Sequence, residues 1–171
     1  MDESTGGLIT AEMVAKVGAE IATARSYPIS ASDIRRWAIA VYYPDPPPAM
    51  FWDGGPDGDD IVAPEEFNPF AWMAAEPQGV QRSPAELSME ARLGLPELGL
   101  PHMLNGGIEV EYGAAMRPGD VIASVTTLDD YSERHGRLGR MLITRSRTEW
   151  RNQDDVHVKT QINTLIRYGD T

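Results

Sequence analysis

The sequence predicts an α+β fold: one domain in which an antiparallel sheet wraps around a buried helix. Segments with helical periodicity occupy the first half of the chain, and long segments with strand periodicity follow residue 104. Helices first and a meander of strands afterwards is typical of this class. The length of 171 residues suits a single domain with its own hydrophobic core.

The run from Leu104 to Asp120 opens the predicted sheet. Apolar and acidic residues alternate along it, with Ile108, Val110 and Tyr112 against Glu109 and Glu111. This period of two is typical of a strand with one dry and one wet face. Gly106 and Gly107 precede the alternation and permit a sharp turn or a close approach to a ligand. Residues 117–120 read as a turn before the next strand.

Three more strands are predicted, over residues 121–128, 141–150 and 156–168, because these stretches alternate and are rich in β-branched residues. Residues 152–155 form a polar hairpin turn between the last two. The last strand has the clearest alternation. One side carries Val156, Val158, Thr160, Ile162, Thr164, Ile166 and Tyr168, and the other carries mostly His157, Lys159, Gln161, Asn163 and Arg167.

Two amphipathic helices are predicted near the N-terminus. Thr10 can cap the first. Its apolar face consists of Met13, Val14, Val17 and Ile21. Ser30 and Asp33 resemble a capping box at the start of the second. Its apolar stripe consists of Ile34, Trp37, Ala38 and Val41. This helix must end by Pro44, because residues 46–48 are also prolines and lack backbone donors.

Residues 64–75 begin with acids and become apolar nearly all round, which predicts a deeply buried helix. Its large side chains either line a hydrophobic ligand tunnel or belong to the core; they are Phe67, Phe70, Trp72 and Met73. Residues 76–100 read as a surface segment with one weak helical signal over residues 85–93.

The charge balance excludes several classes of function. Twenty-six acidic residues against 15 basic ones give a formal charge of -11, which disfavours nucleic acid and anionic membrane surfaces as partners. Forty-two per cent hydrophobic residues place the chain among globular proteins. The start of the chain lacks the pattern of a signal peptide, so we expect a cytoplasmic location.

Metal chemistry is not expected either. The chain has no cysteine and therefore no thiolate ligand or nucleophile. The acidic loop at residues 54–60 carries Asp57, Asp59 and Asp60. These three acids can be read as a calcium loop, but the spacing of a calcium-binding loop and its terminal Glu are missing, so a solvated loop is the better interpretation.

The order of these segments resembles the MaoC-like dehydratases, in particular their N-terminal or fatty-synthase-type half, which has the hot-dog fold. The matching pieces are SYPISASDIRRWA at residues 26–38, YYPDPPPAMFWD at 42–53, APEEF at 63–67, LNGGIEVEY at 104–112 and MRPGD at 116–120. The last strands, with TEWRNQDD and TLIRY, are also similar. The resemblance implies a hot-dog domain over residues 26–171 and a helical extension over residues 1–25.

The resemblance implies a hydro-lyase: reversible hydration of 2-enoyl thioesters carried on coenzyme A or on the phosphopantetheine of an acyl carrier protein, with no other cofactor. This chemistry needs a base for water and an acid for the α-carbon. Catalytic members supply both in a motif D-x-N-P-x-H, which falls here on residues 45–50. Asp45 is kept, but Met50 replaces the histidine. A thioether cannot transfer protons, so this copy should lack the acid-base pair.

The three histidines of the chain and Asn105 are the candidate substitutes for the missing histidine. His102, in a Pro-flanked loop before the twin glycines, can face a cavity or be structural. His135 and His157 have no carboxylate partner at a suitable spacing. Asn105 occupies a place where relatives often have histidine; with Gly106 and Gly107 it either holds the thioester or forms a turn at the strand entry.

Arginines gather between the predicted strands, at Arg134, Arg137 and Arg140, with Arg145 and Arg147 beyond. They are a candidate docking site for coenzyme A phosphates or for an acidic carrier protein, or simply a solvated hairpin end.

Three hypotheses follow. In the first, the chain is the degenerate half of a hydratase or dehydratase, which shapes the acyl pocket beside a catalytic MaoC-like subunit and is active only with it. In the second, it is a homodimeric hydratase or thioesterase that uses Asp45 or His102. In the third, it binds acyl thioesters without catalysis. A second unit is expected because the exposed edge of such a sheet is satisfied by pairing.

Overall fold

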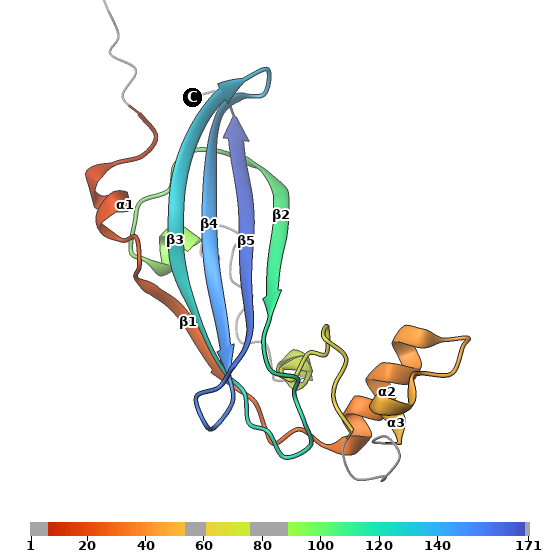
Figure 1. Cartoon of the computed structure of the whole chain (residues 1–171). Coiled ribbons are helices and arrows are strands. Elements are labelled where there is room, and N and C mark those ends of the chain that lie inside the picture. Colours follow the sequence, from red (N-terminus) through yellow and green to blue (C-terminus); the bar gives the residue numbers. More distant parts are fainter. Residues whose placement is uncertain (1–6, 54–60, 76–88, 170–171) are drawn as a thin grey trace, which may run out of the picture.

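The computed structural model describes residues 7–53, 61–75 and 89–169. Their strands form one antiparallel sheet in the order β1-β3-β4-β5-β2, which curves along its length (Figure 1). The strands are β1 (Glu20–Arg25), β2 (His102–Tyr112), β3 (Ala123–Gly136), β4 (Gly139–Arg151) and β5 (His157–Gly169). The predicted strands after residue 104 are therefore confirmed, and β1 adds one at the opposite edge.

The alternation predicted for β4 is confirmed by burial. Leu142, Thr144 and Ser146 are all buried on one face of the strand. On the other face, Arg145 and Arg147 make ion pairs with Asp129 of β3, with nitrogen–oxygen distances of 3.5 and 3.4 Å. The hairpin that joins β3 to β4 closes at Gly136 and Gly139. The sequence pattern therefore gives the correct buried face of β4, and the register between β3 and β4 comes from the structure alone.

The first predicted helix is shorter than expected. The Thr10 side chain caps α1 (Ala11–Ala15) by accepting a hydrogen bond from the Met13 amide, as predicted. The chain then turns at Gly18, where φ is +85°, and Ile21 lies in β1 rather than on the helix. Because β1 pairs with β3, residues 20–25 join the same sheet as the segment after residue 26. The division into an extension over residues 1–25 and a domain over residues 26–171 stays a prediction.

The second predicted helix is confirmed. Ser30 caps α2 (Ala31–Tyr42): its hydroxyl accepts from the Asp33 amide at 3.1 Å and donates to the Asp33 carboxylate at 2.7 Å. The helix ends before Pro44, and α3 (Ala49–Trp52) follows the prolines. Figure 1 shows both helices beyond one end of the sheet rather than on its face.

The buried helix predicted over residues 64–75 is wrong. This segment consists of turns followed by a short 3-10 helix, η1 (Ala71–Ala75). Pro69 cannot donate within a helix, and the Asn68 side chain accepts from the Phe70 amide at 2.9 Å, which holds a local turn instead. Phe67 is buried, whereas Met73 is exposed.

A different segment covers the face of the sheet. The short helix α4 (Met89–Arg92) and the loop after it bury Leu93, Leu95 and Leu100 against Leu128 and Leu142 of the central strands. A sheet packed against a helical segment confirms the α+β, hot-dog class. Among the described residues the covering helix is α4, which begins within the weak helical signal of residues 85–93.

A second core lies near α2. It joins Ile34 of that helix to Phe67, Ile122 and Val158, so the end of the sheet and the helices share one apolar cluster. No helix in the described ranges is long and apolar enough to cross a membrane.

Candidate functional site

The segment that the resemblance aligns with the catalytic motif, residues 45–50, runs from the loop after α2 into α3. Asp45 is exposed, and its amide donates to the Tyr42 carbonyl at 2.8 Å. Met50 is 52% exposed on α3, with no ring nitrogen at this place to transfer a proton. All three histidines of the chain lie on strands: His102 starts β2, and the other two are on β3 and β5. The acid-base pair of the motif is therefore not present in this segment.

None of the histidines has a carboxylate partner among the contacts of the described residues. His102 is exposed and its ring lies against Tyr168, with centroids 5.1 Å apart. His135 is near the end of the β3–β4 hairpin, opposite Arg140. The Nε2 atom of His157 hydrogen-bonds to the Thr160 hydroxyl at 2.8 Å. These contacts are typical of structural histidines, and a catalytic role of His102 stays a prediction.

Asn105, Gly106 and Gly107 form a β-bulge inside β2 rather than a turn ahead of it. The pairing with β5 shifts by one residue between Asn105 and Gly107. The Asn105 side chain accepts from the Gly107 amide at 2.9 Å, and Gly107 has a φ of +123° that side-chain-bearing residues rarely adopt. The side-chain amide oxygen of Asn105 is thus occupied by a hydrogen bond that stabilises the bulge. Thioester binding by this trio stays a prediction.

The aromatic residues predicted to line a tunnel lie near α2. Phe67 packs edge-to-face on Trp37, and Phe70 does the same on Trp150. A cavity of about 430 Å³ lies between the α2 end and this segment; its lining includes Phe67 and Trp72. Met73 is exposed and is not part of that lining. Their role in holding an acyl chain stays a prediction.

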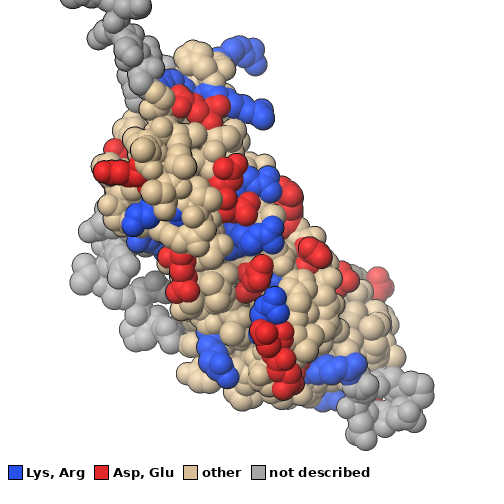
Figure 2. Space-filling model, turned by 60° about the vertical axis from the view of Figure 1, so that its left-hand side comes forward, with Lys and Arg blue, Asp and Glu red and all other residues tan. Residues whose placement is uncertain are grey.

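The arginines of the hairpin are interspersed with acids. Arg140 pairs with Glu133 at 3.0 Å, and Arg145 also pairs with Glu109 at 3.1 Å. Arg134 and Arg137 lie on the exposed end of the hairpin. Figure 2 shows red and blue side chains mixed on this face rather than a uniform basic patch. A docking role for Arg134, Arg137 and Arg140 stays a prediction. The hairpin surface carries less net positive charge than its arginines alone suggest, because acidic side chains pair with some of them.

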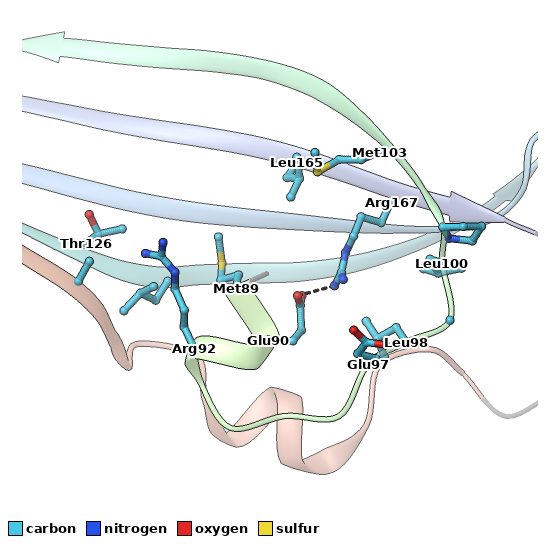
Figure 3. A pocket seen from close by; sticks show the side chains of 14 residues that line it. Met89, Glu90, Arg92, Glu97, Leu98, Leu100, Met103, Thr126, Leu165 and Arg167 are labelled. Atoms are coloured by element: carbon cyan, nitrogen blue, oxygen red, sulfur yellow. Dashed lines mark ion pairs between the residues drawn. The ribbon is translucent and has the colours of Figure 1, made fainter. Parts of the chain in front are cut away.

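A larger cavity was not predicted from the sequence. It has a volume of about 840 Å³ and lies between α4, the loop after it and the inner face of the sheet (Figure 3). Its apolar wall includes Ile21, Met89, Leu98, Leu100, Met103 and Leu165. Such a volume is typical of small-molecule sites. No local sequence pattern indicates it, because its walls come from four separate strands, one short helix and the loop after that helix.

A buried ion pair borders this cavity. The Arg167 guanidinium lies 2.5 Å from a carboxylate oxygen of Glu90, which is 2% exposed. The nearby Tyr131 is also buried. Burial, together with the Glu90 carboxylate, raises the pKa of Tyr131 to about 12. This buried group of titratable side chains is built on α4, β3 and β5, far along the chain from residues 45–50.

Metal ligation has no support among the residues that the structure describes. No three of their histidine, aspartate or glutamate side chains are grouped to hold an ion. The predicted acidic loop of Asp57, Asp59 and Asp60 lies outside the described residues.

The fold and site define a hot-dog-type domain with a partly open, largely apolar cavity against its sheet. The family model for the FAS1-like dehydratase domain region matches residues 15–161. The chain therefore belongs to this family. No curated protein matches the sequence significantly.

Solved structures share the fold at low sequence identity. A chain in the crystal structure of the ChsH1-ChsH2 complex from Mycobacterium tuberculosis is 16% identical, with a TM-score of 0.65 over 94% of this chain and 90% of that one. The MaoC-like dehydratase from Rhodospirillum rubrum is 18% identical, with a TM-score of 0.52 over 91% and 94%. A chain of the HadBC (3R-hydroxyacyl-ACP dehydratase) complex from Mycobacterium tuberculosis is 15% identical, with a TM-score of 0.52 over 88% of this chain and 96% of that one.

Proposed function

We propose that this chain is the non-catalytic half of an enoyl thioester hydratase or 3-hydroxyacyl thioester dehydratase. A second MaoC-like subunit supplies the Asp and His that activate water, and this chain shapes the acyl pocket. The observation that carries the proposal is Met50 at the position of the catalytic histidine, on a segment where no other histidine lies. A dehydratase-family chain without its proton carrier requires one from elsewhere.

The exposed edge of the sheet supports the proposal that a second subunit binds this chain. β2 is the last strand in the sheet order, so one of its edges has no neighbour within the described residues. Its apolar side chains are uncovered: Met103 is 65% exposed and Ile108 54%. A long edge strand with exposed apolar residues is a ready site for pairing with another sheet. Two of the similar structures are complexes by their own descriptions, which fits this arrangement.

The cavity supports the acyl-binding role. Its volume of about 840 Å³ and its mostly apolar wall suit a long or bulky acyl group. A coenzyme A or carrier-protein arm delivers such a group without any further cofactor. The partner subunit then performs the chemistry on the thioester end.

The test compares the chain alone with a mixture. The chain is purified by itself and together with a MaoC-like protein that has an intact D-x-N-P-x-H motif, and hydration of a 2-enoyl-CoA is followed by absorbance. We expect turnover only in the mixture. Turnover by the chain alone, abolished by Asp45→Asn or His102→Ala, would establish the self-sufficient enzyme instead. Acyl-CoA binding without turnover in any mixture would establish a thioester-binding protein.

A further inference from the structure

The cavity beside α2, of about 430 Å³, shares no lining residue with the larger one. Four aromatic side chains are part of its wall: Tyr27, Trp37, Phe67 and Trp72. The rings of Tyr27 and Trp72 lie against each other, with centroids 4.4 Å apart and planes at 49°. Tyr27 is 64% exposed, so a ligand can reach its ring. This aromatic cavity therefore offers ring surface on which a flat group can stack.

Polar groups border the same rings. Asp33, Arg36 and Asn68 all line the aromatic cavity, and all three are exposed. Within the described residues Arg36 pairs with Asp33 at 3.9 Å, and an ion pair so long and so exposed contributes little to stability. The Asn68 side-chain oxygen accepts from the Phe70 amide, whereas its NH₂ group has no hydrogen bond to a described residue. A cation, a carboxylate and an amide donor are thus reachable beside the rings.

This combination of groups matches a purine nucleotide more closely than an aliphatic chain. A purine ring stacks on aromatic side chains, and amide or carboxylate side chains can bind the amine and ring nitrogens at its edge. A phosphate attached to it pairs with a guanidinium. An aliphatic chain would use none of the three polar groups. The volume also lies in the range typical of small-molecule sites.

The aromatic cavity is connected to the larger one through β1. Ala22, on β1, lines the larger cavity, and Tyr27, five residues later, lines the aromatic one. Five residues of extended chain span at most about 18 Å. The pantetheine arm of coenzyme A, which separates the thioester from the nucleotide, is of comparable length. An acyl group in the larger cavity therefore leaves the nucleotide within reach of the aromatic one.

We propose that the aromatic cavity binds the adenosine 3′-phosphate end of coenzyme A. The adenine stacks on Tyr27 and Trp72, and its polar edge contacts Asp33 and Asn68. Arg36 pairs with a phosphate. The inference rests on the proposed function in taking the substrate to be an acyl thioester. It deepens that function by assigning coenzyme A, rather than an acyl carrier protein, as the carrier, because the pantetheine arm of a carrier protein ends on the protein and brings no adenine.

The test uses adenosine 3′,5′-bisphosphate, the nucleotide end of coenzyme A without its pantetheine arm. It is titrated into the full chain and followed by NMR, using the indole Nε1–H signals of Trp37 and Trp72. Two further probes separate the contributions, because adenosine lacks the phosphates and ribose 5-phosphate lacks the base. We expect the bisphosphate to bind, adenosine to bind about fivefold more weakly, and ribose 5-phosphate to leave the indole signals unshifted.

Variants of exposed residues locate the site without disturbing the core. Tyr27→Leu should weaken binding of the bisphosphate about tenfold, because stacking is lost. Tyr43→Leu is the matched control, since Tyr43 is 80% exposed but does not line the cavity, and its affinity should equal that of the unmodified chain. Arg36→Met should weaken binding of the bisphosphate about fivefold and leave that of adenosine unchanged.

Three results would overturn the inference: no shift of the indole signals with the bisphosphate, equal weakening by Tyr27→Leu and Tyr43→Leu, or weakening by Arg134→Met but not by Tyr27→Leu, which would place the nucleotide at the β3–β4 hairpin. Hydration of a carrier-protein thioester by the two-subunit mixture, with no nucleotide binding, would refute this inference and leave the proposed function standing. Nucleotide binding with no hydration in any mixture would refute the proposed function alone.

Discussion

At the scale of single residues, Gly106 decides how closely β2 and β5 meet. A Cβ atom at this position would lie 2.7 Å from the Thr164 Cγ2 atom and 3.1 Å from Ile166 Cγ1. Neither neighbour is a flexible side-chain end, because both are β-branched. The twin glycines are therefore explained by packing and by the bulge at Gly107, without invoking a substrate.

We expect Gly106→Ala to destabilise the chain by about 1–3 kcal/mol, since the added methyl overpacks the strand pair. Denaturant unfolding measures the loss. The additional change Thr164→Ser removes the nearest methyl group, so the double variant should recover part of the stability. A single variant as stable as the parent chain would show that the close contact has no energetic weight.

Glu133 links the hairpin to the N-terminal segment. It accepts from Arg140 at 3.0 Å and from the Leu8 amide at 2.7 Å. Burial raises its pKa, but the hydrogen bonds from Arg140 and Leu8 outweigh that effect and leave the pKa below the ordinary value of a glutamate. The folded state thus favours the ionised form of the Glu133 carboxylate more than the unfolded state does.

A lowered pKa fixes the direction of the pH dependence. The stability that Glu133 contributes is fully present above the ordinary glutamate pKa and is lost as the pH falls through the lower folded-state value. We expect Glu133→Gln to lower the melting temperature at pH 7, and the difference from the parent chain to shrink toward pH 3. Thermal unfolding across this range measures it, and a difference that grows on acidification would contradict the assignment.

At the scale of elements, β2 is an edge strand whose side chains are left largely uncovered. All its residues but one are exposed in the isolated chain, although its sequence alternates like a strand with a dry face. The short β1 occupies the opposite edge. The dry face predicted for β2 is therefore one that the chain cannot cover within its described residues.

We expect Ile108→Lys to weaken association with the second subunit by at least about tenfold, because a charge on a paired edge strand opposes strand addition. Val125→Lys is the control: Val125 is also an exposed apolar residue, but it lies on β3, an inner strand. Light scattering after size-exclusion chromatography measures the complex. Equal weakening by both substitutions would exclude β2 as the specific interface.

At the scale of the whole molecule, the proposed division of labour between two subunits sets the expected effect of mutations. In the complex with a catalytic partner, Asp45→Asn should change kcat/KM less than about twofold, because Asp45 is exposed and lacks its histidine. Replacing the histidine of the partner's motif should reduce turnover by about a hundredfold or more. A large loss of kcat/KM with Asp45→Asn, measured in the same absorbance assay, would show that this chain takes part in catalysis.

Several features follow from the sequence by itself. The bounds of α2 depend on Ser30, Asp33 and the prolines that follow, and the strands after residue 104 depend on a period of two. These signals are local, because caps and alternation are set by neighbouring residues along the chain. Met50 is equally read from the sequence, and the resemblance predicts a histidine at that position in catalytic relatives.

Only the tertiary structure decided which faces are dry. The side of β5 predicted to be wet carries Arg167, yet this side chain lies against the cavity and pairs with Glu90. The predicted central helix over residues 64–75 is replaced by turns, and α4 covers the sheet instead. Alternation along a strand separates two faces but does not say what lies over each one. That depends on segments distant in sequence, whose packing no local pattern encodes.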